Sequence, residues 1–244
     1  MGAWLGWRWA IALGVVVAVP AAALFTTVVS PDEPVRPNQS VWARLRIRPV
    51  LELLGRPPIA LTVGLSALGA FVWQATASFL PAFLIEHHGY SEAMAGGLFS
   101  VYFGVQGLAQ PALGTLSDRM GRYPAAAIAY GAGVVGYGGL VVGPDVWMVG
   151  AAVVCAGVSM SWGAALLPKF MDHLGAEERS AGFGLIRTVY MVLGASGSVV
   201  TGAAADVVGW TWAFLGLALL LAGMLTVLEG AIWRARRRTT QVPS

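Results

Sequence analysis

The sequence predicts an all-α protein that crosses a membrane several times. Of its 244 residues, 57% are hydrophobic and only 11% are charged, whereas a soluble domain has about 25% charged residues. The chain also contains apolar runs of about 20 residues, the length that a helix needs to span a bilayer. These runs do not alternate with the period of two that a transmembrane β-barrel requires, and helices satisfy their own backbone polar groups in lipid. We therefore expect a polytopic membrane protein with seven transmembrane helices.

Seven segments of the sequence have the length and composition of a span. The first begins after Arg8 and contains Ala21-Ala22-Ala23, which resembles the cleavage region of a signal peptide. Its apolar run is too long for a signal peptide and fits a transmembrane helix. The fourth segment is the shortest. The predicted spans are residues 9–29, 59–83, 93–113, 124–142, 146–167, 183–205 and 211–233.

The basic residues predict how these spans are oriented. If the N-terminus lies outside, the inside segments are 30–58, 114–123, 168–187 and 234–244, and they hold every one of the 15 Lys and Arg residues except Arg8. Positive charge is retained on the cytoplasmic side of membrane proteins. We therefore expect a multi-pass protein of the cell membrane, with its N-terminus outside and its C-terminus in the cytoplasm. The outer turn at His87 and His88 carries no Lys or Arg, and two adjacent His residues do not predict a metal site.

The predicted loop between the third and fourth spans carries the most specific pattern in the chain. Residues 114–122 read G-x-L-x-D-R-x-G-R, which resembles the cytoplasmic loop signature of the major facilitator superfamily of secondary transporters. The resemblance implies that this loop is a latch for one state of an alternating-access cycle. The alternative is a topology anchor without a gating role. The predicted gating residues are Gly114 for close helix packing, Asp118 as an acceptor, Arg119 and Arg122 as anchors or partners of Asp118, and Gly121 for the turn.

A second pattern, G-W-x-W-A, opens both the first and the last predicted span, at residues 6–10 and 209–213. Trp favours the membrane interface, and two copies in one topological context suggest parallel repeats. In the family, two six-helix halves are joined by a long cytoplasmic loop. The resemblance then implies four parts: residues 1–30 as the last helix of an N-terminal half, 31–57 as the loop between halves, 58–234 as a C-terminal six-helix bundle, and 235–244 as a basic cytoplasmic tail. The other helices of the N-terminal half would lie outside this sequence.

Several polar or aromatic residues fall within the predicted spans. Such residues usually face the interior of a bundle or a water-filled cavity. The resemblance implies that the spans carrying them line a central substrate cavity, and the alternative is hydrogen bonding between helices without ligand contact. The candidate cavity residues are Gln74, Tyr102, Gln106, Trp162, Arg187 and Tyr190.

These observations favour transport of a small solute by a secondary carrier, here as a truncated or half-size chain. The expected partners are a small-molecule substrate, the lipid bilayer, and either a missing N-terminal half or a second copy of the chain. Coupling of substrate transport to a proton is one alternative. We expect no nucleic-acid partner, no metal and no cofactor, and no enzyme activity, because the sequence lacks a nucleophile elbow and a phosphate-binding loop. A non-transporting membrane interaction subunit or remnant is the alternative. The substrate and the type of coupling stay open, since the fold does not name the ligand.

Overall fold

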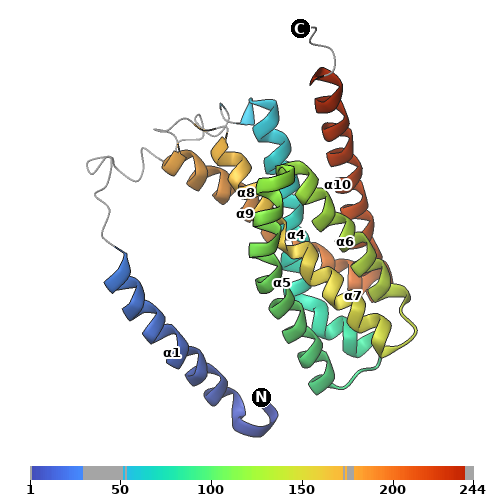
Figure 1. Ribbon diagram of the computed structural model, residues 1–244. Helices are drawn as coiled ribbons and strands as arrows, with labels where there is room; N and C mark the ends of the chain where they lie inside the picture. Colours follow the sequence, from blue (N-terminus) through green and yellow to red (C-terminus); the bar gives the residue numbers. More distant parts are fainter. Residues whose placement is uncertain (1, 30–51, 53, 173, 175–178, 240–244) are drawn as a thin grey trace. The chain divides into compact units, whose positions relative to one another are not determined.

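The computed structural model describes residues 2–29, 52, 54–172, 174 and 179–239 (Figure 1). Most of the predicted loop 31–57 and the end of the predicted tail, residues 240–244, lie outside the described residues. The chain forms two compact units, Met1–Leu45 and Arg46–Ser244, which are described separately below.

The first unit is described as one helix. Helix α1 (Gly2–Val28) is 27 residues long and contains Pro20. Near its end, the hydroxyl groups of Thr26 and Thr27 donate hydrogen bonds to the carbonyl oxygens of Ala23 and Leu24, each at 2.9 Å. Both hydroxyls are thus satisfied within the helix, and the side chains described along residues 13–16 and 18–29 are exposed. This apolar, exposed helix is suited to lipid or to another helix.

The second unit is a bundle of six helical rods, one of which is interrupted. No strand occurs among its described residues. The rods are α4 (Pro57–Glu86), α5 (Glu92–Met120), α6 (Arg122–Val142), the interrupted rod α7 (Val146–Ser159), η1 (Met160–Trp162) and α8 (Gly163–Asp172), then α9 (Arg179–Val208) and α10 (Trp210–Thr239). Together with α1, these rods confirm the predicted all-α class. Six of the predicted spans fall within a rod of the bundle, and the first, 9–29, extends one residue beyond the end of α1.

Local sequence signals determine where the rods begin. Helix α4 has Pro at its first two positions, where a missing N–H is harmless. The hydroxyl of Ser91 caps α5 by accepting from Met94 N. The carboxylate of Asp145 caps α7 and accepts from Trp147 N and Met148 N at 2.9 Å. Such caps satisfy N–H groups that have no partner within the helix.

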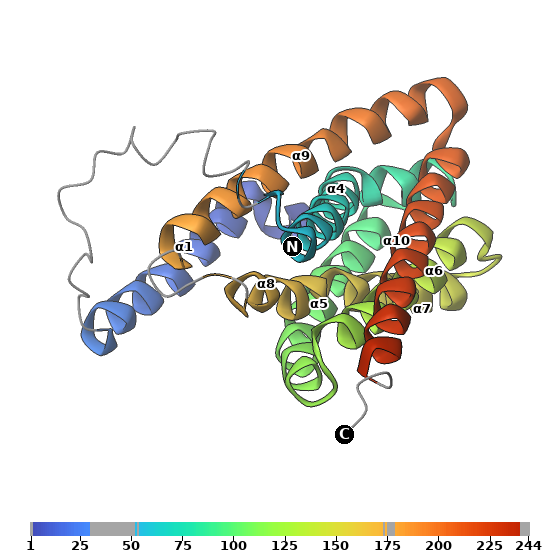
Figure 2. The same ribbon diagram turned by 90° about the horizontal axis from the view of Figure 1, so that it is seen from above.

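Glycine allows the closest approaches between helices. Helix α4 packs most extensively on α9 (Figure 2). A Cβ atom added at Gly197 of α9 would lie 2.8 Å from the carbonyl carbon of Phe71 in α4 and closer still to its oxygen. Likewise, a Cβ at Gly136 of α6 would lie 2.9 Å from the oxygen of Ala152 in α7. The backbones therefore touch directly, as is typical of helix pairs within membranes.

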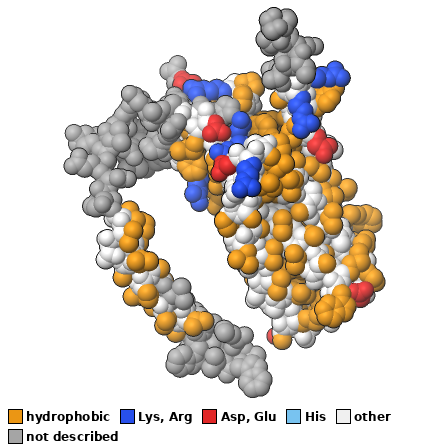
Figure 3. Space-filling view, in the orientation of Figure 1, with side chains coloured by type: hydrophobic (Ala, Val, Ile, Leu, Met, Phe, Trp, Pro, Cys, Tyr) orange, Lys and Arg blue, Asp and Glu red, His pale blue; other side chains and the backbone are white. Residues whose placement is uncertain are grey.

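Charge separates the two ends of the bundle. The rods alternate in direction, so that Arg56, the α5–α6 turn, the end of α8, the start of α9 and the end of α10 share one end, called the basic end here. In Figure 3 the Lys and Arg side chains gather at this end, and hydrophobic side chains cover the length of the bundle below it. Among the described residues of this unit, the opposite end carries no Lys or Arg. This asymmetry is the one that a multi-pass membrane protein requires.

Helix α5 differs from the other rods in composition. Five rods are long and apolar enough to cross a membrane: α4, α6, the α7–α8 rod, α9 and α10. Helix α5 has 29 residues, enough to span, but its composition is less apolar. Because it packs against α4, α6 and α7 within the bundle, its length and place are those of a transmembrane helix whose surface is only partly adapted to lipid.

Candidate functional site

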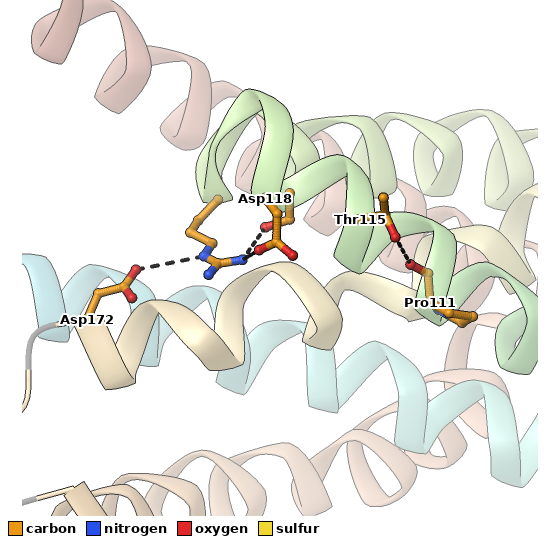
Figure 4. Close-up of polar contacts among 6 residues, drawn as sticks. Pro111, Thr115, Asp118 and Asp172 are labelled. Atoms are coloured by element: carbon orange, nitrogen blue, oxygen red, sulfur yellow. Dashed lines mark hydrogen bonds and ion pairs between the residues drawn. The ribbon is translucent and has the colours of Figure 1, made fainter.

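The turn between α5 and α6 holds the predicted signature. Helix α5 ends and α6 begins at Gly121, whose φ of +98° is a backbone conformation that favours glycine. Across this turn, Arg122 Nη1 donates to Asp118 Oδ1 at 2.6 Å and to Ser117 Oγ at 3.1 Å (Figure 4). The structure thus joins Asp118 and Arg122, two of the predicted gating residues, and adds Ser117, which is buried.

Arg122 also connects this turn to the end of another helix. Its Nε atom lies 3.7 Å from Oδ2 of Asp172, the last residue of α8 (Figure 4). The side chain of Arg122 is 25% exposed, that of Asp118 67% and that of Asp172 47%. Pairs this exposed contribute only about 0–1 kcal/mol to stability. The cluster therefore positions the turn against α8 more than it stabilises the fold.

The other two signature residues are not part of this cluster. Arg119 is exposed at the end of α5. A Cβ atom at Gly114 would meet nothing within 4 Å, so no described neighbour packs closely on it, in contrast to the close packing predicted for this residue. Gly114 instead lies on an uncovered face of α5.

A second set of contacts at the basic end joins α4, α6 and α8. The ammonium group of Lys169 in α8 lies 5.2 Å from the ring centre of Tyr123 in α6, a cation–π distance. The hydroxyl of Tyr123 is 3.3 Å from Oγ1 of Thr62 in α4. Three rods are therefore linked through side chains next to the signature turn, which makes this end a connected unit.

Midway along the bundle, Gln106 of α5 bridges two other rods. Trp73 Nε1 of α4 donates to Gln106 Oε1 at 3.4 Å, and Gln106 Nε2 donates to the oxygen of Met160 at 3.4 Å. Met160 begins η1, the short 3-10 segment between α7 and α8. Such a segment within a long helix often marks a functional hinge. Of the predicted cavity residues, Trp162 belongs to this segment and Gln106 donates a hydrogen bond to its first residue.

The remaining candidate cavity residues lie in different environments. Tyr102, Trp162 and Tyr190 are buried within the bundle. The indole of Trp162 covers Gly69, where an added Cβ would lie 2.7 Å from Cε2, and it packs edge-on against Tyr190 with ring centres 6.2 Å apart. Gln74 is half-buried and Arg187 is exposed. The structure joins Trp162 and Tyr190, and the substrate-cavity role of the whole set stays a prediction.

Helix α5 has one uncovered face that is rich in small residues. At Gly96, Gly104, Gly107 and Gly114 an added Cβ would meet nothing within 4 Å, and Ser100 between them is exposed. Spacings of three, four and seven residues place these five positions on one stripe, called the α5 glycine face here. The larger Phe103 and Pro111 are exposed on the same stripe. Asp118 continues the stripe one turn beyond Gly114, at the basic end. The signature turn and the glycine face are therefore parts of one surface.

The opposite end holds a polar cluster that the sequence pattern did not predict. The carbonyl oxygens of Val141 and Leu140, at the end of α6, accept from Nε2 of His87 at 3.3 Å and from Nε2 of His88 at 2.7 Å. Trp210 Nε1 donates to Glu86 Oε2 at 2.6 Å. Burial lowers the pKa of His88, and the neighbouring His87 adds to this effect against the hydrogen bond to Leu140. The cluster joins α4, α6 and α10.

Comparison with known proteins identifies a family and a structural likeness. Residues 1–197 and 70–244 each match the family profile described as the Major Facilitator Superfamily, so the two matches together cover the chain. No protein in the curated set matches it. The chain resembles the crystal structure, determined in meso, of the POT family transporter PepTSo, with a TM-score of 0.58 and 18% sequence identity.

The likeness to PepTSo concerns the fold alone. It covers 75% of this chain but only 38% of that protein. The chain therefore spans well under half of the length of the transporter that it resembles. The likeness therefore concerns only a part of that transporter.

Proposed function

Because the chain belongs to the Major Facilitator Superfamily, we propose that it transports a small solute by alternating access as part of a two-bundle secondary carrier. In this proposal residues 58–234 are one six-helix bundle, and the solute path lies between this bundle and a second one. Residues 1–30 correspond to the last helix of the other half, 31–57 to the loop between halves and 235–244 to a basic tail. The chain is a multi-pass membrane protein, and we place its basic end in the cytoplasm because Lys and Arg are retained there.

The α5 glycine face carries this proposal. A transmembrane helix that faced lipid along this stripe would present mostly glycine and Ser100 to hydrocarbon, with Phe103 and Pro111 as its larger side chains. Small residues are typical of surfaces where transmembrane helices pack closely on one another. The low apolarity of α5 relative to the five other rods supports the same interpretation. We infer that a second bundle covers this face, supplied either by a preceding segment of a longer chain or by a second copy.

The signature turn is placed to respond to contact between the bundles. Asp118 lies on the same stripe as the α5 glycine face, and its carboxylate is held by Arg122 at 2.6 Å. Arg122 also lies 3.7 Å from Asp172 at the end of α8, and the α7–α8 rod contains the 3-10 segment at Met160. A second bundle that approached Asp118 would compete for Arg122. We propose that Asp118, Arg119, Gly121 and Arg122 form the latch of the basic end, with Gly114 at the contact surface.

The path for the solute follows from the same arrangement. Gln106 links Trp73 to the interrupted rod at Met160, so a solute that bound to its amide would alter contacts on both sides. The half-buried Gln74 and the exposed Arg187 supply further polar groups. Tyr102, Trp162 and Tyr190 are buried in this bundle and would reach a solute only after the rods rearrange. Whether solute transport is coupled to protons can be tested by measuring uptake with and without an imposed pH gradient.

The test is uptake into proteoliposomes of the chain assembled with its second bundle. A panel of radiolabelled sugars, amino acids, organic anions and organic cations is offered with and without a pH gradient. Gly104→Leu adds bulk to the α5 glycine face, and overpacking at a helix interface costs about 1–3 kcal/mol. We therefore expect it to reduce uptake about tenfold or more. The matched control is Gly150→Leu in α7, where an added Cβ also meets nothing within 4 Å.

The outcomes separate transport from the alternative role. Saturable uptake of at least one solute, abolished by Gly104→Leu and retained by Gly150→Leu, supports the proposal. Equal uptake by both variants would show that the α5 glycine face is not a contact surface. If no solute of the panel accumulated although the bundles assembled, the chain would be a non-transporting membrane subunit.

A further inference from the structure

An apolar groove runs between α4 and α10 on the half of the bundle next to the basic end. Helix α10 packs mainly on α6 and α9 and touches α4 less, which leaves a groove of about 510 Å³ between them. This volume lies within the range of about 300–1,000 Å³ that is typical of ligand sites. Its walls are apolar and include Ala60, Gly64 and Leu68 from α4 and Leu220, Gly223 and Val227 from α10.

Two glycines give the groove its depth. An added Cβ at Gly64 or at Gly223 would meet nothing within 4 Å. These glycines face each other from opposite walls, so their missing side chains leave room for a long, narrow apolar group. Neither position needs glycine for close helix packing, unlike Gly197 in α9.

The depth of the groove places it within the hydrocarbon core of a bilayer. Trp233 of α10 is exposed and its ring lies 3.7 Å from the guanidinium of Arg237. Exposed Trp beside Arg at a helix end marks the membrane interface. At 1.5 Å per residue, Val227 lies about 9 Å and Leu219 about 21 Å below Trp233. The hydrocarbon core is about 30 Å thick, so the groove lies among the acyl chains and reaches from the basic side to about the middle of the bilayer.

A positive charge stands over the mouth of the groove. The side chain of Arg234 folds back along α10: its Nε donates to the oxygen of Gly230 at 3.2 Å, and Nη2 would lie 3.7 Å from a Cβ at Gly230. Gly230 is seven residues beyond Gly223 and therefore on the same side of α10. On the other wall, Arg56 precedes α4 by one residue and lies four residues before Ala60. Glu229 projects about 200° around α10 from Val227, away from the groove.

We propose that this groove binds one acyl chain of an anionic phospholipid from the leaflet on the basic side, with Arg234 holding the phosphate. The apolar walls, with the space left at Gly64 and Gly223, receive the acyl chain. The guanidinium of Arg234 next to Gly230 selects a negative headgroup. Basic sites between transmembrane helices are suited to anionic headgroups. The site is independent of transport, because it lies on α4 and α10 and not on the α5 glycine face.

Native mass spectrometry of the full chain in detergent micelles tests this site. The protein is incubated with dioleoyl phosphatidylglycerol or with dioleoyl phosphatidylcholine, and the fraction that retains one lipid is measured. We expect phosphatidylglycerol to be retained in preference to phosphatidylcholine. Gly223→Leu should lower its retention about tenfold, the factor given by two lost methylene contacts. Arg234→Gln should lower it about fivefold and remove the headgroup preference.

The controls use the same helix. Gly216→Leu places the same side chain on the same stripe of α10, seven residues further from the basic end, where an added Cβ also meets nothing within 4 Å. Arg236→Gln removes a neighbouring charge. Both should retain phosphatidylglycerol like the original chain. Equal losses in Gly223→Leu and Gly216→Leu, or equal retention of the two lipids, would overturn the proposal. So would a change of Gly223→Leu from dimer to monomer with unchanged lipid retention, since a second copy would then occupy the groove.

Discussion

The packing of α4 on α9 should be destabilised if Gly197 gains a single methyl group. In Gly197→Ala the new Cβ would lie 2.8 Å from the carbonyl carbon and 3.0 Å from Cα of Phe71, with the carbonyl oxygen nearer still. All three atoms are backbone, so no rotamer change can relieve the clash. The two helices would have to separate by about 1 Å along their most extensive contact, and overpacking of this kind costs about 1–3 kcal/mol.

The matched control for this substitution is Gly184→Ala in the same helix. There an added Cβ meets nothing within 4 Å, and replacing Gly by Ala in a helix is favourable by up to about 1 kcal/mol. The two variants should therefore shift stability in opposite directions. Thermal unfolding in detergent, followed by helical circular dichroism, measures both shifts. Equal melting temperatures for Gly197→Ala and Gly184→Ala would refute the direct backbone contact between α4 and α9.

Three further predictions concern the two ends of the bundle. In a complete two-bundle assembly, Asp118→Asn should weaken closure of the basic end and change the accessibility of that end. Arg119→Lys keeps the charge and should have a smaller effect. If the two variants behaved identically in uptake and accessibility, the turn would be a topology anchor only. Because the pKa of His88 is lowered in the fold, its contribution to stability is complete above the ordinary His pKa of about 6.5 and is lost as pH falls through the lowered value. His88→Gln should flatten the decline in melting temperature between about pH 7 and pH 5, and an unchanged decline would assign it to other groups. With Cys155 replaced by Ala, a membrane-impermeant thiol reagent added outside intact cells should label Glu92→Cys and not Met120→Cys, and the reverse would invert the proposed orientation.

The last experiment uses Met120 and Glu92 because the structure restricts the choice of positions. Ser117, at the centre of the signature, is a natural place for a cysteine from the sequence alone. It is buried and accepts a hydrogen bond from Arg122, so a cysteine there would report on burial and not on the side of the membrane. Met120 and Glu92 are exposed and avoid this ambiguity.

The rods of the bundle could be predicted from the sequence because each apolar run exceeds the length of a span. The interruption at Met160–Trp162 could not. The segment is uniformly apolar apart from Ser159 and Ser161, and no proline precedes it within α7. The break depends on contacts made in the fold: Gln106 donates to the oxygen of Met160, and Ser161 Oγ donates to Val158 O at 2.6 Å. Hydrogen bonds of this kind draw carbonyl groups away from the helical ladder.

One part of the candidate site could be predicted from local residue spacing, and the other part could not. Asp118 and Arg122 are four residues apart on a turn with Gly121 between them, so their pairing follows from local spacing. Asp172 comes from a different rod, and only folding brings it within 3.7 Å of Arg122. One signal could have identified it, because an acidic residue in the last turn of a helix is disfavoured by the helix dipole and calls for a cationic partner. The cluster of His87, His88 and Trp210 had no such local signal.

In the function proposed for this chain, the bundle transports a solute only when a second bundle covers the α5 glycine face. The most direct measurement is uptake of a solute identified by the panel into liposomes prepared with graded protein density, from vesicles that hold a single copy of this bundle to vesicles that also hold a second bundle. We expect that single-bundle vesicles show no more uptake than protein-free vesicles, and that saturable uptake begins when the second bundle is present and is lost in Gly104→Leu. Saturable uptake of the same solute by vesicles with one bundle alone would contradict it.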